Sequence, residues 1–420
     1  MASSIDQFMH EHRQVTRRWL LRASAGTLVT WRSAGLWGDD RSQSPVLVEA
    51  IANLESFLTL QDEFEDVSRG TPKPHTLTDE QKQGVGLTRE TWSLDVVSDT
   101  DQPTQLRNEL SAEQGTAFRF TDLMKLAETH SVRFAKVMTC LNIGCPLGMG
   151  IWEGVPMREV IWLTQPKLDL RRVFYYGYHN DDPKQMFRSS LPIGRVLEDP
   201  FDLPPVVLCY KLNGEWLSSE RGGPVRVVVP EAYGFKSIKW LSHVVLSNIA
   251  HANDTYAEKN NDVDSPLKTF AATLTVPKKV EANKPFAVTG YAQVGISGLS
   301  KVQVWIHKDG DELPSDDRYF AAAPWEDSEI LPPPNHWGGG LLDNRIPSPT
   351  WGIDSETGEP QTWPMRLAKV HWAKLIDGLP TGRYTLRSRT VDEHGHAQPM
   401  PRPFRKSGHS SIELVEFEVG

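Results

Sequence analysis

The sequence predicts an α+β domain followed by an all-β sandwich. Between Ser68 and about Ala257, short strand-like runs alternate with loops, and helical stretches are few. After about Asp262, apolar and polar residues alternate with the period of two that half-buried strands show. A chain of 420 residues, 39% of them apolar, is long enough to form two or three domains with their own cores.

The elements follow from local patterns. Apolar residues at helical spacing predict a helix over 45–64, ahead of the main domain. In that domain we expect a helix over 120–129 and strands over 92–97, 132–140, 206–211 and 225–229. In the sandwich, strands are expected around Val304, Leu386 and Phe417, with turns at 308–310 and 392–395. The Pro-, Gly- and Trp-rich insert 324–364 reads as a long ordered loop.

Charge and missing motifs exclude several classes of protein. A net charge of -9 and a pI near 5.8 argue against nucleic-acid binding, which normally requires a basic face. No apolar run after the N-terminus is long enough to predict a membrane span in the mature chain. The sequence has no P-loop, no G-x-S-x-G elbow and no haem-attachment motif, and Gly148-x-Gly150-x-x-x-Gly154 has the wrong spacing for a nicotinamide site. A small molecule or another protein is therefore the expected partner.

The N-terminus is typical of an export signal. Arg17 and Arg18 precede Leu20 and Leu21 and a modest apolar run, as in twin-arginine signals. The expected location is then periplasmic or otherwise exported. An ordinary amphipathic helix is the alternative, because Arg22 interrupts the apolar run and no A-x-A cleavage site is evident.

Two groups of residues could carry chemistry. Cys140 ends a predicted strand in a Gly-bearing loop, where its thiol could react or bind a metal; a buried structural cysteine is the commoner alternative. Cys145 and Cys209 are the other thiols, and the spacing of the three does not fit a zinc site or a disulfide framework. The second group offers the donors that a phosphate needs, although it could also be a solvated basic edge; it comprises Arg226, Lys236, Ser237 and Lys239.

Three segments resemble, in their order along the chain, the sulfite oxidase family of molybdopterin-dependent oxidoreductases. Residues 152–160 are similar to the family's W-x-G-V-P-L-R-D-L, residues 210–214 to Y-x-M-N-G, and residues 224–241 to P-V-R-V-V-V-P…G-x-x-S-V-K-W-L. The resemblance extends from about Gly86 to the C-terminus. It implies a mixed α/β molybdopterin-binding domain and an immunoglobulin-like dimerisation domain. The expected organisation is an export signal at 1–40, a helix and linker at 41–75, the catalytic domain at 76–261 and the sandwich at 262–420.

The resemblance also implies roles for individual residues. In the family, the cysteine that binds the metal lies about a dozen residues before the W-x-G-V-P motif. Cys140 stands twelve residues before Trp152, whereas Cys145, at seven residues, is too close to this motif. The pterin and its phosphate would be held by segments that contain Arg226, Lys236, Ser237 and Lys239, with further contacts from Asn142 and Asn180. Candidate catalytic residues are Cys140, Arg221, His179 and Tyr256. The loop that carries His179 and Asn180 could equally be a plain surface loop.

Departures from the family pattern bear on the substrate. Residues 141–144 read L-N-I-G where sulfite oxidases usually have A-G-N-R, so the expected anion-binding arginine is absent. Arg221 stands where many members have a pterin-binding histidine, and residues 69–75 replace the usual Arg-Asn-His segment. We therefore expect poor sulfite turnover unless Arg221, His179 or Arg69 reaches the metal pocket.

The sequence thus predicts a molybdenum-molybdopterin oxidoreductase that performs two-electron oxygen-atom transfer on sulfite or a related oxo-compound. An external carrier such as a c-type cytochrome would exchange the electrons, and the sandwich would form a homodimer. The alternatives are a sulfoxide or N-oxide reductase on the same centre, and a non-catalytic scaffold that kept the fold. Metal analysis separates the scaffold from the enzymes, because a scaffold needs no molybdenum.

Overall fold

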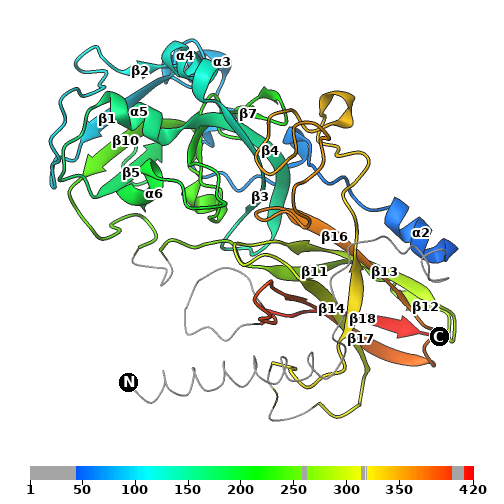
Figure 1. Cartoon of the computed structure of the whole chain (residues 1–420). Coiled ribbons are helices and arrows are strands. Elements are labelled where there is room, and N and C mark those ends of the chain that lie inside the picture. The colour runs from blue at the N-terminus through cyan, green and yellow to red at the C-terminus, as the bar shows by residue number, and fades with distance from the viewer. Residues whose placement is uncertain (1–43, 258–262, 314–316, 318, 400–410) are drawn as a thin grey trace, which may run out of the picture.

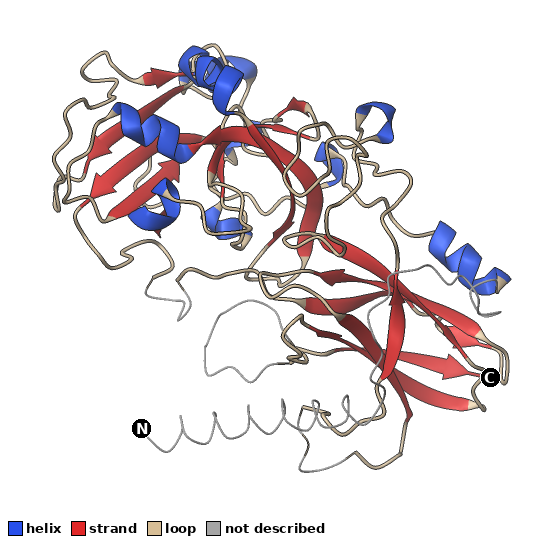
Figure 2. Cartoon of the chain, viewed as in Figure 1, coloured by secondary structure: helices blue, strands red, loops and turns tan. Residues whose placement is uncertain are grey.

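The computed structural model describes residues 44–257, 263–313, 317, 319–399 and 411–420. Strands outnumber helices among these residues and gather in two bodies, the first built from α3 to β10 and the second from β11 to β18, against which α2 packs (Figure 1, Figure 2). The α+β domain followed by an all-β sandwich is therefore confirmed. The expected domain boundaries stay predictions, and the expected export signal lies outside the described residues.

Two five-stranded sheets form the first body. One has the order β2-β1-β10-β5-β6, with only β1 and β10 parallel; its strands are β1 (Ser93–Ser98), β2 (Phe118–Arg119), β5 (Arg172–Gly177), β6 (Arg188–Pro192) and β10 (Leu241–Ser247). The other has the order β3-β4-β7-β8 with β9 also on β7; its strands are β3 (Val132–Thr139), β4 (Pro146–Pro156), β7 (Val207–Leu212), β8 (Glu215–Trp216) and β9 (Arg226–Val228). Strands β1, β3, β7 and β9 confirm the four predicted runs.

Short helices and two hydrophobic cores complete this body. The predicted helix appears as α4 (Phe120–His130), which buries Phe120 and Leu123 on its apolar face. The remaining helices are α3 (Asp79–Gly84), α5 (Met157–Leu163), α6 (Ile193–Leu197), η3 (Pro74–Thr76) and η4 (Gly234–Lys236). Both sheets contribute to one hydrophobic core, with Val96 and Tyr175 from one and Val155 and Leu208 from the other, and strands β3, β4 and β7 form a second core with Phe64.

The second body is a sandwich of strands in the order β11-β13-β16-β15-β14-β17-β18-β12. These strands are β11 (Phe270–Thr275), β12 (Lys279–Val280), β13 (Phe286–Gln293), β14 (Lys301–Lys308), β15 (Glu326–Ile330), β16 (Lys369–Ile376), β17 (Gly382–Val391) and β18 (Glu413–Val419). Val304, Leu386 and Phe417 are buried in its core, as their alternation predicts.

Two expectations need correction. The helix expected over 45–64 ends early: α2 covers Pro45–Ala52, and only the short η2 (Gln61–Glu63) follows. Phe57 and Leu58 leave the helical path because they bury against the second body, where the Leu58 N–H donates to the Trp337 carbonyl (2.8 Å). The insert 324–364 contains strand β15, which pairs with both β14 and β16 and so is not loop throughout.

The second body also supports β3, the strand that ends just before Cys140. Val137 of β3 shares a core with Leu341 and Leu367, and its N–H donates to the Leu367 carbonyl (2.8 Å). At the end of the strand, Thr139 Oγ1 donates to Oε1 of Gln293 in β13 (2.5 Å). Both bodies therefore fix the point from which Cys140 projects. Within the described residues, no helix has the length and apolar character needed to cross a membrane.

Candidate active site

A cavity of about 210 Å³ lies in the first body beside the end of β3. One wall is the segment 61–75, which we call the strap; it crosses the body before α3. The opposite walls come from the loop after β3, the end of β5 and the residues around η4. These elements are distant in sequence, so the cavity exists only in the folded chain.

Cys140 lies on the cavity wall at the tip of the β3–β4 hairpin. Its N–H donates to the Cys145 carbonyl (3.3 Å), and its own carbonyl accepts from the Gly144 N–H (2.9 Å). Gly144 has a φ of 66°, in the left-handed region that glycine tolerates best. Cys145 is not on this wall, and Cys209 is fully buried in a core, where burial raises the pKa of its thiol to about 12. Among the three thiols, Cys140 has the position expected of a ligand.

Tyr256 joins the strap to the Cys140 loop. Its hydroxyl oxygen accepts from Nη2 of Arg69 (3.0 Å) and from Nδ2 of Asn142 (3.1 Å). Because both bonds use the oxygen, the hydroxyl proton remains for a third partner. The Arg69 guanidinium also lies 4.6 Å from the Phe187 ring centre, which fixes its plane. Arg69, Asn142 and Tyr256 all line the cavity, so a cation and two polar groups lie beside the Cys140 loop.

Arg221 and Arg226 line the same cavity. Arg226 donates to the carbonyls of Arg221 (2.8 Å) and Ser237 (2.6 Å), and Arg221 donates to the Phe64 carbonyl (2.8 Å). The Nε atoms of both arginines are buried and have no partner within the described residues. Ser237 lines the wall as well, and its hydroxyl accepts from the Val229 N–H (3.1 Å). Two guanidinium groups therefore keep donors that a polar ligand could satisfy.

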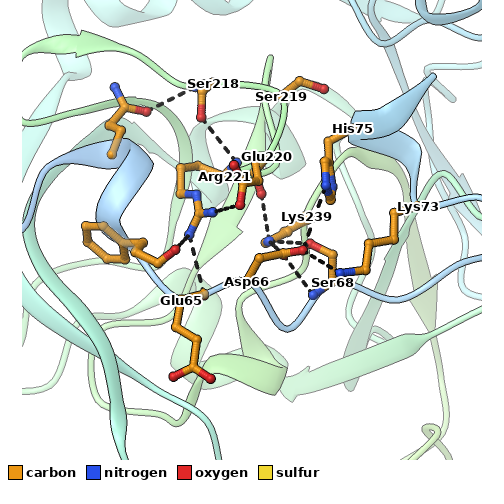
Figure 3. A network of polar contacts seen from close by, with 12 residues as sticks. Glu65, Asp66, Ser68, Lys73, His75, Ser218, Ser219, Glu220, Arg221 and Lys239 are labelled. Atoms are coloured by element: carbon orange, nitrogen blue, oxygen red, sulfur yellow. Dashed lines mark hydrogen bonds and ion pairs between the residues drawn. The ribbon is translucent and has the colours of Figure 1, made fainter. Parts of the chain in front are cut away.

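Lys239 also lies on the cavity wall, but its ammonium is already bonded. It donates to Oδ1 of Asp66 (3.1 Å), Oγ of Ser68 (2.6 Å) and the Glu220 carbonyl (2.7 Å), as Figure 3 shows. Burial and the charge of Arg226 lower the pKa of Lys239 to about 7. Lys239 therefore connects the strap to the loop that carries Arg221.

Two predicted cofactor residues lie off the cavity wall. Lys236 is fully buried and donates to the Ser190 carbonyl (2.9 Å) and to Oδ2 of Asp254 (3.5 Å), so it stabilises the packing behind η4. Asn180 donates to the Pro72 carbonyl (2.9 Å) and holds the far end of the strap. His179 does line the cavity, with its ring edge-on to Tyr176.

Sequence reasoning missed most of the strap. Phe64, Glu65, Val67 and Ser68 line the cavity, and Asp66 bonds to a cavity residue. One sequence feature pointed to this region: residues 69–75 differ from the family's Arg-Asn-His segment. That difference drew attention to Arg69, but to none of the residues before it.

Comparison with known proteins identifies the domain around this cavity. Residues 83–255 match the family model described as the oxidoreductase molybdopterin binding domain. Sulfite oxidase of Gallus gallus is 34% identical over 99 residues, which cover 23% of this chain and 21% of that protein. The domain at 83–255 belongs to the sulfite oxidase family of molybdopterin-dependent oxidoreductases.

Other curated relatives match over longer stretches of the chain. The NADH nitrate reductase of Volvox carteri is 24% identical over 182 residues, covering 36% of this chain and 21% of that protein. The protein-methionine-sulfoxide reductase catalytic subunit MsrP of Ralstonia nicotianae is 28% identical over 186 residues, covering 39% and 53%. The chain thus spans about half or less of the length of these curated relatives.

A solved structure extends the likeness to the whole fold. The sulfane dehydrogenase SoxCD from Paracoccus pantotrophus superposes with a TM-score of 0.58 at 16% identity, covering 93% of each chain. At this identity the match concerns the fold, including the sandwich that follows the molybdopterin-binding domain.

The cavity residues fit the molybdenum-molybdopterin cofactor of the sulfite oxidase family. Cys140 supplies the soft thiolate that a high-valent metal needs as a protein anchor. The unpartnered Nε atoms of Arg221 and Arg226 are buried donors that match the acceptor-rich pterin and its phosphate. Gly177 lines the same wall, and a Cβ there would lie 2.0 Å from the Lys239 carbonyl, so the backbones pack closely only because this residue is glycine.

Proposed function

We propose that this chain is a molybdenum-dependent oxidoreductase that transfers an oxygen atom in a two-electron reaction and exchanges electrons with an external carrier, such as a c-type cytochrome. One observation carries the proposal: the Cys140 thiol shares a cavity with Arg69, Asn142 and Tyr256 inside a domain of the sulfite oxidase family. A scaffold that only kept the fold would have no need for a cation and an available hydroxyl proton beside a thiol.

Each residue has a definable part in that reaction. The bound molybdenum centre supplies the two-electron redox chemistry, and Cys140 anchors it. Arg69 binds an oxyanion, because its guanidinium lies in the cavity and is oriented by Phe187 and Tyr256. The Tyr256 hydroxyl donates its free proton to a substrate oxygen while Asn142 and Arg69 hold the phenol in place.

Sulfite is the first substrate candidate, because Arg69 provides a cation where residues 141–144 provide none. A sulfoxide is the second candidate. The cavity wall beside Arg69 is aromatic, with Phe187 and Phe235 packed edge-on to Tyr256 (5.1 Å for both), and apolar groups on a sulfoxide would bury there.

We expect natively expressed protein to contain one molybdenum atom per chain and to oxidise sulfite with a dye acceptor. The same preparation is assayed for reduction of sulfoxides and N-oxides with a dye donor, so that both directions are compared on metal-replete enzyme. Molybdenum with faster reduction than oxidation would favour the sulfoxide reductase, and protein without molybdenum in a cofactor-competent host would favour the scaffold.

A homodimer through the sandwich is a further part of the proposal. The sandwich has a core of its own and contributes support for β3, but none of its described residues lines the cavity. A self-complementary face is the commonest basis of oligomers. We expect light scattering at micromolar concentration to give twice the mass of one chain, and the mass of a single chain under those conditions would argue against the dimer.

Export by the twin-arginine route is proposed from Arg17 and Arg18. Replacing both arginines by lysine keeps the charge but removes the feature that the export machinery reads. We expect this variant to accumulate in the cytoplasm, as fractionation and immunoblotting would show. Export at the level of the unchanged protein would contradict the assignment.

A further inference from the structure

Cys145 is a second thiol at the tip of the β3–β4 hairpin, and the proposed reaction gives it no part. Thr139 of β3 and Pro146 of β4 are register partners, so the next residues toward the turn, Cys140 and Cys145, face each other across the hairpin. The Cys140 N–H donates to the Cys145 carbonyl (3.3 Å), in agreement with this pairing. The two cysteines are therefore the pair that closes the turn at 141–144.

The backbone at this closing pair is compatible with a disulfide. Opposite residues of an antiparallel pair direct their side chains to the same face of the sheet. Their Cα atoms lie about 5.5 Å apart where backbone hydrogen bonds join them, and a disulfide spans Cα atoms roughly 4.4–6.8 Å apart. Burial and the charges of Glu65 and Cys140 raise the pKa of Cys145, as expected of a thiol with a second thiol nearby. A bond between the two sulfur atoms can therefore form with the hairpin in place.

The third cysteine of the chain does not compete with this pair. Cys209 lies in β7, is fully buried, and its thiol donates to the Lys211 carbonyl (3.2 Å). Burial also raises the pKa of Cys209 to about 12, so almost none of it is the reactive thiolate at neutral pH. Cys140 and Cys145 are both partly exposed and have free thiols. A soluble disulfide reagent can therefore reach these two cysteines, whereas Cys209 is protected.

We propose that Cys140 and Cys145 form a reversible disulfide while the chain lacks its cofactor, and that this bond blocks molybdenum binding. The oxidant is a low-molecular-weight disulfide such as oxidised glutathione. One protein thiolate attacks it, which forms a mixed disulfide and releases one glutathione thiol. The second protein thiol then attacks the mixed disulfide, forms the Cys140–Cys145 bond and releases the other glutathione as a thiol. Two electrons and two protons thus pass from the cysteine pair to the oxidant.

The disulfide and the metal compete for the same sulfur atom. Cys140 in a disulfide has no thiolate to offer a metal, and a metal-bound Cys140 has no free thiolate to attack a disulfide. Oxidation therefore excludes the cofactor from an empty chain, and a bound cofactor protects Cys140 from oxidation. This consequence rests on the proposed function, in which Cys140 anchors the molybdenum. Formation of the disulfide itself does not depend on that function.

The disulfide is tested on the full-length chain, produced in a host that makes no molybdopterin and then treated with oxidised glutathione. Trypsin releases both cysteines in one peptide, 137–158, which is mapped by mass spectrometry without reductant. We expect this peptide to lose two hydrogen atoms, to carry no glutathione, and to return to its original mass with dithiothreitol. Cys209 should stay a free thiol.

Cys145→Ser and Cys209→Ser are the matched variants. In Cys145→Ser the mixed disulfide cannot be resolved, so glutathione on Cys140 should be about tenfold or more above its level in the unchanged chain, because the neighbouring thiol acts at a high effective concentration. Cys209→Ser should form the disulfide like the unchanged chain. Equal glutathione on Cys140 with and without Cys145, or a bond that includes Cys209, would overturn the pair.

The block is tested by adding molybdopterin and molybdate to the reduced form and to the disulfide form. Elemental analysis should find about one molybdenum per chain in the reduced form and less than about a tenth of that in the disulfide form, with recovery after dithiothreitol. In the holoprotein, oxidation of peptide 137–158 should be about tenfold slower or more. Full loading of the disulfide form without reductant, or equally fast oxidation of the holoprotein, would refute the competition. Failure of the reduced chain to take up molybdenum would count against the proposed function alone, because mapping the disulfide needs no metal.

Discussion

Cys140→Ser is expected to abolish molybdenum retention and to reduce turnover by more than about 100-fold, because even the outer partners of metal ligands cost 10- to 100-fold when removed. A serine hydroxyl is a harder and far less acidic ligand than a thiol, so it does not replace the soft anchor. Elemental analysis gives the metal content, and X-ray absorption shows whether the metal–sulfur shell has changed.

Cys145→Ser is the matched control for this variant. Cys145 is on the same hairpin, its carbonyl accepts from the Cys140 N–H, and its side chain is off the cavity wall, so molybdenum should stay near one atom per chain. Should Cys140→Ser keep an unchanged metal–sulfur shell while Cys145→Ser loses it, the ligand would have to be Cys145.

The position of Cys140 could be predicted because its evidence is local. The apolar run before Cys140 forms β3, and Gly144 allows the turn after it. The number of residues between Cys140 and Trp152 can be counted directly in the sequence. The strands of the sandwich were predictable for the same reason, since the alternation of apolar and polar residues that identifies a strand is visible in consecutive residues.

Other features depend on distant partners and could not be predicted. Apolar spacing over 45–64 suggests one helix, yet Leu58 pairs with the backbone near Trp337, which is far along the chain. Lys236 and Lys239 are three residues apart and look alike in the sequence. Only the fold shows that Lys236 faces Asp254 behind η4, whereas Lys239 faces the cavity and Asp66.

The anion site shows most clearly what could not be predicted from the sequence. The motif after Cys140 suggested that a cation was missing, and Arg69, Arg221 and His179 were possible substitutes. All three line the cavity. The hydrogen bonds of the two arginines differ. Arg221 donates to a backbone carbonyl of the strap, whereas Arg69 donates to a tyrosine hydroxyl beside the Cys140 loop. This difference makes Arg69 the strongest candidate for the substrate anion.

Arg69→Ala is accordingly expected to lower kcat/KM for sulfite by roughly 10- to 150-fold, the equivalent of a charge-assisted hydrogen bond of about 1.5–3 kcal/mol. Reduction of dimethyl sulfoxide, which is neutral, should change by less than about threefold, because no charged contact is lost. Arg89→Ala is the matched control, since Arg89 is exposed and lies against Trp216 away from the cavity.

The comparison with the other two cavity residues decides which group binds the anion. Arg221→Ala should release cofactor, because Arg221 lines the cavity, its guanidinium holds the Phe64 carbonyl and its buried Nε has no partner within the described residues. His179→Ala should have the smallest effect of the three. Metal content is measured for each variant before kinetics, so that lost cofactor is not mistaken for lost substrate binding. Efficient sulfite oxidation that survives all three substitutions would place the anion site elsewhere, because no charge of these side chains would then be required for turnover.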